Sequence, residues 1–302
     1  MVSEETLFSV DEFERAYRRL TVGRHARSMD EAREFYGWTQ HKLDILGIYL
    51  RLYRRVAGNG SYIDGFAGTG EISVDGIVRE GSVGVALKSG AFKRMRLYEK
   101  PAKARSLQEW VSSHAKPTQL AGIAVIGGDF NKKVRADLDA EVVPKDKPCF
   151  AFLDPDSTQL DWTTVETLAR YKAECSPPET CKIELWILLN TYQALMRLMP
   201  INGKVVHEKT LNRWLGGEAG WRDLYEQGQG APFFARRYAK RLESEFGYGA
   251  ANVMTIRDPK NGRPQYHMIH ASDHHAAHSF MRWSATHAHP EDSIALPLPG
   301  LA

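Results

Sequence analysis

The stretch SYIDGFAGTG, Ser61 to Gly70, joins a short apolar run to an aspartate and a glycine-rich turn. Such a turn is either a ligand-binding loop after a strand or a plain structural turn. A P-loop would place a lysine followed by Ser or Thr after the glycines, and this chain continues with Glu71 and Ile72. Asp64, ahead of the glycines, would repel a pyrophosphate but suits a cationic ligand. The stretch therefore argues against a phosphate cradle.

Short apolar runs alternate with helical stretches along the chain. The expected strands are residues 62–63, 96–98, 123–126, 149–153 and 183–189, followed by a hairpin of 252–256 and 265–271. Short apolar strands separated by helices indicate a parallel sheet covered on both faces. The sequence therefore predicts an α/β, Rossmann-like fold with a mostly parallel sheet that ends in an antiparallel hairpin.

The helices divide the chain into expected regions. Ser9 and Ser28, each followed three residues later by Glu, predict helix starts, and an amphipathic helix is expected from Thr39 to Val56. A further helix is expected to begin at Ser82, which leaves Glu71 to Gly81 as a loop. About sixty residues separate the fifth strand from the hairpin, which predicts a helical insertion. The expected regions are an N-terminal helical extension (1–57), a main domain (58–283) with an insertion at about 191–251, and a C-terminal tail (284–302).

Composition limits the class of protein. Hydrophobic residues make up 43% and charged residues 25% of the chain, as in soluble globular proteins. No apolar run is long enough for a membrane span and no signal peptide is recognisable, so we expect no membrane contact and a cytoplasmic location. The three cysteines are too few for a disulfide framework. A net charge of +3 is only mildly basic, and the local basic clusters are either solvated helix faces or a phosphate-binding surface.

Acidic residues follow four successive expected strands. They are Asp64, Glu99, Asp129 and Asp154. Each one alone is explained as a turn former or a helix cap, but ligands of open parallel sheets bind at this edge. S-adenosylmethionine carries an ammonium and a sulfonium and no phosphate, so it fits an acidic, glycine-lined pocket, and it is the expected cofactor.

The expected cofactor contacts follow from the chemistry of each group. Asp64 would face the amino-acid end or order water around it, Glu99 would accept hydrogen bonds from a ribose diol, and Asp129 would accept one from the adenine amine. Phe130 would stack on the adenine ring. The glycine loop would let the backbone approach the ligand, and it comprises Gly65, Phe66, Ala67, Gly68 and Gly70.

The chain resembles the three-Cys-motif partner family, a set of bacterial proteins similar to class I S-adenosylmethionine-dependent methyltransferases. The matching segments, in order, are HKLDILGIYLRLY, YIDGFAGTG, GSVGVAL, LYEK, GGDFN, AFLDPDSTQLDW, ELWILLNTYQALMRL and YHMIHASDHHAAHSFM. The resemblance implies a Rossmann-like methyltransferase fold of seven strands with a final hairpin. It also implies a partner protein that carries the three-cysteine motif; Cys149, Cys175 and Cys181 are not that motif.

The segment DPDS, Asp154 to Ser157, is similar to the Asp-Pro-Pro-Tyr loop of methyltransferases that act on exocyclic base amines. Only Asp154 and Pro155 match, and they are the expected catalytic residues. Because Ser157 stands in place of the aromatic residue, stacking on a base would have to come from Trp162 or Tyr192. The expected activity is methyl transfer to nucleic acid, DNA or RNA; the alternative is a non-catalytic partner that retains the fold.

A histidine-rich segment, HMIHASDHHAAHSF, lies near the end of the chain. His274 and His278 have helical i, i+4 spacing and could share a metal with Asp273. His267 and His270 would lie on opposite faces of a strand and could not converge. Solvated or substrate-facing histidines are therefore favoured, and no metal is assigned.

Overall fold

The computed structural model describes residues 34–35, 37–74, 76–172, 182–200, 205, 207–258 and 260–288. The helix starts expected at Ser9 and Ser28, the thiols of Cys175 and Cys181, and residues 289–302 lie outside the described residues. Within those ranges, no helix is both long and apolar enough to span a bilayer.

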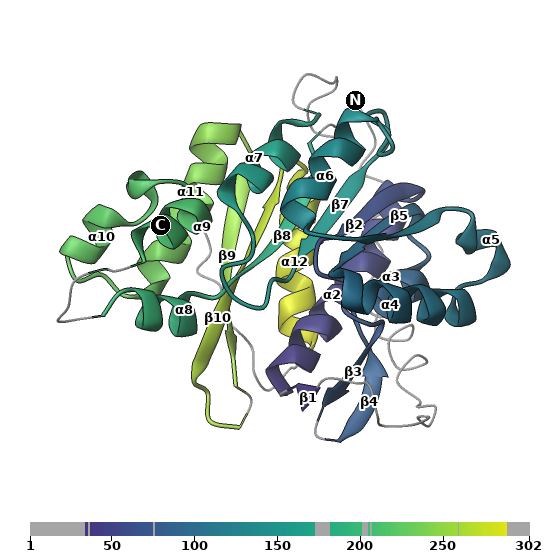
Figure 1. Ribbon diagram of the computed structural model, residues 1–302, viewed down its shortest axis with the longest axis horizontal. Helices are drawn as coiled ribbons and strands as arrows, with labels where there is room; N and C mark the ends of the chain where they lie inside the picture. The colour runs from purple at the N-terminus through teal and green to yellow at the C-terminus, as the bar shows by residue number, and fades with distance from the viewer. Residues whose placement is uncertain are drawn as a thin grey trace.

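A seven-stranded sheet forms the centre of the molecule, with the strand order β6-β5-β2-β7-β8-β10-β9 (Figure 1). Its strands are β2 (Gly60–Asp64), β5 (Phe92–Glu99), β6 (Ile123–Gly127), β7 (Cys149–Leu153), β8 (Glu184–Leu189), β9 (Ala250–Arg257) and β10 (Pro264–Ser272). All pairs are parallel except those of β10, which runs antiparallel to β8 and β9. The predicted Rossmann-like architecture is confirmed, and the strand order reverses between β2 and β7.

Helices cover both faces of the sheet because its central strands are apolar on both sides. One layer contains α2 (Gly37–Ala57), α3 (Ser82–Ser89), α4 (Pro101–His114) and α12 (His275–Ala288). The other contains α6 (Phe130–Asp139), α7 (Trp162–Arg170), α8 (Thr191–Leu198), α9 (Glu208–Leu215) and α11 (Ala231–Phe246). The structure also contains two short helices, α5 (Pro117–Leu120) and α10 (Arg222–Glu226), and the 3₁₀ turn Glu218–Gly220.

Two expected domain boundaries cut through the first layer. Helix α2 was expected to lie in an N-terminal extension. Its side chains Ile45, Leu46 and Leu50 are instead completely buried in the core between this layer and the sheet. Helix α12 continues to Ala288, past the expected start of the tail, and buries Ala285. Helices α2 and α12 also pack on each other. The described parts of these segments therefore belong to the main domain.

The expected loop from Glu71 to Gly81 is instead a hairpin. Strand β3 (Glu71–Val74) pairs antiparallel with β4 (Ile77–Glu80), and β1 (Glu34–Phe35) pairs parallel with β3. The turn contains Gly76 with φ of 76°, a left-handed conformation that favours glycine. The Asp-Gly pair between two short apolar runs is a hairpin signal, so the prediction of a loop was wrong.

The predicted helical insertion between β8 and β9 is confirmed: it consists of α8, α9, α10 and α11. It packs on the sheet through buried aromatic and aliphatic side chains, namely Leu211, Trp214, Trp221, Phe234 and Tyr238. Phe233, in the same insertion, has 44% of its surface exposed.

Candidate functional site

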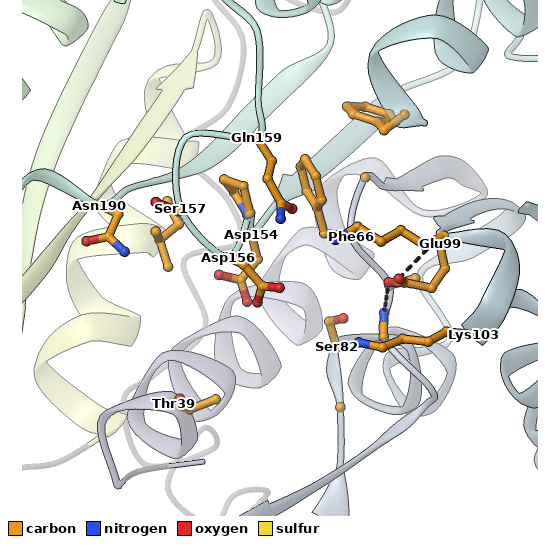
Figure 2. Close-up of a pocket in the computed structure, with 18 of the residues that line it drawn as sticks. Thr39, Phe66, Ser82, Glu99, Lys103, Asp154, Asp156, Ser157, Gln159 and Asn190 are labelled. Carbon is orange, nitrogen blue, oxygen red and sulfur yellow. Dashed lines mark hydrogen bonds between the residues drawn. The ribbon is translucent and has the colours of Figure 1, made fainter. Parts of the chain in front are cut away.

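A cleft of about 750 Å³ lies at the carboxyl ends of the parallel strands. It is lined by the loops that follow β2, β5, β6, β7 and β8, and also by α2 and β10. Figure 2 shows side chains from these separate elements directed toward a common space, with Glu99 on one side and Asn190 and Ser157 on the other. This is the edge at which open α/β sheets bind ligands.

The glycine loop after β2 forms part of the cleft wall. Gly68 has φ of 65°, and a Cβ added there would meet nothing within 4 Å, so the backbone conformation rather than lack of space calls for glycine. At Gly65 a Cβ would come within 2.9 Å of the Phe130 ring. The loop is also tied to the sheet, because Ala67 N–H donates to the Tyr98 carbonyl at 3.0 Å.

Asp64 does not line the cleft. Its carboxylate is completely buried and accepts hydrogen bonds from Ser82 Oγ (2.7 Å), Tyr62 Oη (3.1 Å) and Phe66 N (3.2 Å). Burial raises the pKa of Asp64 to about 7, although its hydrogen bonds act in the opposite direction. The expectation that Asp64 faces the amino-acid end of a ligand is therefore not met. Asp64 instead lies outside the cleft and binds the backbone of the glycine loop at Phe66.

Glu99 does lie in the cleft, next to the glycine loop (Figure 2). Its Oε2 accepts a hydrogen bond from Gly68 N at 2.9 Å, and its Oε1 accepts one from Lys100 N at 2.9 Å. Each carboxylate oxygen has two lone pairs, so one acceptor position on each oxygen remains after these bonds. The backbone thus holds Glu99 in one orientation with acceptor capacity left.

Asp129 and Phe130 lie in the cleft at the start of α6. Asp129 caps that helix by accepting a hydrogen bond from Asn131 N at 3.1 Å. The Phe130 ring is buried and stands edge-on to Phe66 and Tyr98, with centroids 5.6 Å and 5.0 Å away. Both residues are therefore fixed by local packing while they line the cleft.

The segment after β7, Asp154 to Gln159, forms the middle of the cleft. Asp154 pairs with Lys42 Nζ from α2, and 25% of the Asp154 side chain but only 4% of the Lys42 side chain is exposed. The Lys42 ammonium also lies 5.8 Å from the Phe152 ring centroid and 5.7 Å from that of Tyr266. The pairing balances the Asp154 charge and fixes its carboxylate at the cleft.

The insertion helices support the same segment. Arg197 of α8 donates to Ser157 Oγ at 3.3 Å, and Arg213 of α9 donates to the Thr158 carbonyl at 3.1 Å. Arg213 also forms an ion pair with Asp161 at 3.1 Å and lines the cleft. The insertion is therefore part of the cleft wall and not a separate appendage.

Trp162 and Tyr192, the aromatic residues expected to stack on a substrate, do not line the cleft. Trp162 is buried between Tyr238 and Phe246, at centroid distances of 4.7 Å and 5.4 Å. Tyr192 stacks on His267 at 5.1 Å. The aromatic side chains that do line the cleft among the described residues are Trp38, Phe66, Phe130 and Tyr266. Sequence reasoning missed Trp38, Lys42 and Tyr266.

The histidines of β10 and α12 are held by other groups. His267 hydrogen-bonds with Thr191 Oγ1, and His270 Nε2 with Glu184 Oε1 at 2.9 Å. His278 contacts Asn252 and the Ser272 carbonyl, while Asp273 pairs with Lys182 at 3.1 Å. Within the described ranges, no three His, Cys, Asp or Glu side chains are placed to hold a metal ion.

No family model matches the chain, and no curated protein does. The chain is similar to the solved structure of the mitomycin 7-O-methyltransferase MmcR, with 13% identity over 75% of this chain and 53% of that chain and a TM-score of 0.35. It is similar to protein LPL1258 from Legionella pneumophila, with 10% identity over 83% of this chain and 93% of that chain and a TM-score of 0.47. It is also similar to human methyltransferase-like protein 13 in complex with SAH, with 13% identity over 87% of this chain and 95% of that chain and a TM-score of 0.42. The chain thus spans about half the length of MmcR. The fold assignment rests on the strand order and not on these similarities.

Proposed function

We propose that this protein binds S-adenosylmethionine in the cleft and acts as a methyltransferase. The observation that carries this proposal is Glu99, which two backbone N–H groups hold beside the glycine loop with acceptor capacity left. A carboxylate in that position suits the two hydroxyl groups of a ribose.

The other residues of the cleft fit the same ligand. Asp129 and Phe130 lie one strand farther from Glu99 and offer an acceptor and an apolar ring to an adenine. The glycine loop lacks the lysine and the following Ser or Thr of a P-loop, so it does not match that class of phosphate-binding loop. A volume of about 750 Å³ lies within the range of cofactor pockets.

The cofactor, when bound, supplies a methyl group on a sulfonium. The protein's contribution is to position the acceptor, and Asp154 is the side chain suited to this, because its carboxylate accepts a hydrogen bond from an amine and directs the amine lone pair. Lys42 keeps that carboxylate in place. Asn190 and Asp156 add further polar groups around the same position.

For the acceptor we propose a nucleic acid, with an exocyclic base amine as the reacting group. The support is the Asp154-Pro155 segment at the cleft and two aromatic residues, Trp38 and Tyr266, that line the same cleft. These rings take the role first assigned to Trp162 and Tyr192. Tyr266 is oriented by its hydroxyl, which donates to the Trp38 carbonyl at 3.3 Å.

A second candidate is a non-catalytic Rossmann-fold protein that works in a complex with a three-cysteine-motif partner. The observation that favours it is the pairing of Asp154 with the buried Lys42, which already satisfies part of the carboxylate. In this case the cleft binds S-adenosylmethionine without methyl transfer, and the partner protein binds to a different surface of the molecule.

Titration calorimetry with S-adenosylmethionine and S-adenosylhomocysteine tests the proposed cofactor. Binding of both supports it, and binding of neither ends the methyltransferase proposal. A radiolabelled methyl assay on DNA and RNA then compares the wild type with Asp154→Asn. Loss of transfer with retained cofactor binding supports the catalytic role of Asp154, whereas binding without transfer to any acceptor favours the non-catalytic partner.

A further inference from the structure

Helix α11 carries four basic residues in one short segment, and three of them are paired. Arg237 forms an ion pair with Asp223 at 2.7 Å, Lys240 with Glu243 at 3.1 Å, and Arg241 with Glu245. Arg236 differs, because it is exposed and its guanidinium lies 4.5 Å from the centroid of the exposed Phe233 ring. Among the described residues it has no acidic partner.

The tip of the β9–β10 hairpin provides further cationic groups. Arg257 ends β9, is exposed, and donates to the Gly262 carbonyl at 3.0 Å. Arg263 is exposed on the return side of the same turn. Neither guanidinium forms an ion pair within the part of the chain that the structure describes. Figure 1 shows this hairpin projecting on the same side of the molecule as the β3–β4 hairpin, whose residues Glu71 and Ile72 line the cleft.

Tyr192 of α8 and His267 of β10 lie among the elements that carry Arg236 and Arg257, because α8 and α11 both pack on β10 and β10 pairs with β9. Their rings stack with centroids 5.1 Å apart and an angle of 23° between the planes. Burial, and after it the positive charges of Arg236 and Arg257, lower the pKa of His267 to about 4, so the ring is neutral at physiological pH. The ring pair therefore belongs to the same packed unit as α11 and β9, which carry the two arginines.

Residues next to this group in the strands line the cleft. His267 pairs with Leu189 across the sheet, and the next residue, Asn190, lines the cleft. Tyr266, the neighbour of His267 in β10, lines the cleft from the other face of the same strand. A strand of nucleic acid that placed a base in the cleft would have its adjoining phosphates near this surface.

We infer that Tyr192, Phe233, Arg236 and Arg257 form a binding surface, the arginine patch, for the phosphodiester backbone of a single-stranded nucleic acid, in which the buried His267 ring supports Tyr192 by stacking. This inference rests on the proposed function, whose acceptor it locates. Two unpaired guanidinium groups match phosphate oxygens, and the exposed parts of Phe233 and Tyr192 offer stacking faces to neighbouring bases.

The test is fluorescence anisotropy with labelled single-stranded DNA and RNA dodecamers over a range of salt concentrations. We expect Arg236→Ala/Arg257→Ala to bind about tenfold more weakly at low salt, with the salt slope reduced by about 1.4, the value for two lost phosphate contacts on a single strand. Arg236→Lys/Arg257→Lys keeps the charge and should recover most of the affinity. The DNA and RNA arms identify which backbone is preferred.

The matched control is Arg105→Ala/Arg170→Ala, which removes two exposed arginines that pair within helices α4 and α7. A loss of oligonucleotide affinity that is confined to the patch variant supports the inference. An equal loss of affinity in the patch variant and the control variant overturns it. Binding of an acidic peptide but of neither oligonucleotide also overturns it.

Calorimetry with S-adenosylhomocysteine on the same proteins separates this inference from the proposed function. Cofactor binding with no effect of the patch variant on oligonucleotide affinity overturns the arginine patch alone. Patch-dependent oligonucleotide binding without cofactor binding supports the arginine patch and overturns the proposed function.

Discussion

The Asp64 carboxylate accepts a hydrogen bond from Ser82 Oγ at 2.7 Å, which joins the end of β2 to the first residue of α3. The same carboxylate accepts the Phe66 N–H, so it also fixes the direction in which the glycine loop leaves the strand. Asp64, which precedes the glycine loop in the sequence, thus affects the ligand site indirectly, because it fixes the backbone that lines the cleft.

Asp64 should make stability depend on pH. Burial raises its pKa in the folded protein from 3.8 to about 7. Between these values the folded state retains a proton that the unfolded state has released, so the free energy of unfolding falls as pH rises through this window. Asp64→Asn removes this contribution. Urea unfolding at about pH 5 and about pH 8 should show a larger loss of stability for the wild type than for the variant; equal losses would contradict the raised pKa.

Glu99→Gln should weaken cofactor binding. The amide nitrogen that replaces one carboxylate oxygen cannot accept a hydrogen bond from Gly68 or Lys100, and the charge is lost. We expect the dissociation constant for S-adenosylhomocysteine to rise by about tenfold to a hundredfold in calorimetry. Glu109→Gln, an exposed change on α4, is the control and should bind like the wild type. Similar constants for both variants would count against the role of Glu99.

Lys42 and Asp154 should be energetically coupled. Lys42→Met leaves a partly buried carboxylate without its partner and should cost about 2 kcal/mol in urea unfolding, less than for a fully buried pair because Asp154 is partly exposed. Lys42→Met/Asp154→Asn should recover much of that loss. A double-mutant cycle measures the coupling, and strictly additive effects would show that the pair contributes nothing to stability.

Trp162 should behave as a core residue. Trp162→Ala should lower the free energy of unfolding by about 3–5 kcal/mol, because the indole is packed between Tyr238 and Phe246. Trp162→Phe retains most of the packing and is expected to leave oligonucleotide and cofactor affinity unchanged in anisotropy and calorimetry. A selective loss of oligonucleotide affinity in Trp162→Phe would restore the stacking role.

The order of elements was predictable because the main strands are apolar runs bounded by turns. Strand β7 agrees with its prediction at both ends, β8 differs by one residue at one end, and β10 differs by one residue at each end. The β3–β4 hairpin was missed because each strand has only four residues and because its other partner, β1, lies far away in the sequence. The Asp-Gly turn was the local signal for the hairpin, whereas local patterns carry little information about the pairing of β3 with β1.

The loops of the candidate site were predictable, but the directions of several side chains were not. The orientation of Asp64 depends on Ser82, which lies eighteen residues away. The position of Trp162 depends on α11, which follows it by some seventy residues. Lys42 had a detectable signal, since it occupies an apolar position of α2, one turn before Leu46, where a lysine requires a buried partner.

The position of β10 sets the order in which the protein can be completed during synthesis. It is the last strand among the described residues, but it lies between β8 and β9 and supplies Tyr266 to the cleft. On the ribosome, β9 therefore emerges before β10, the strand with which it pairs, and the sheet beyond β8 is completed only when β10 has left the exit tunnel. Helix α12 must then reach α2, which was made first among the packed helices described. A nascent chain released before β10 would thus retain the glycine loop but have an open cleft and two unpaired strand edges, a form suited to recognition by chaperones.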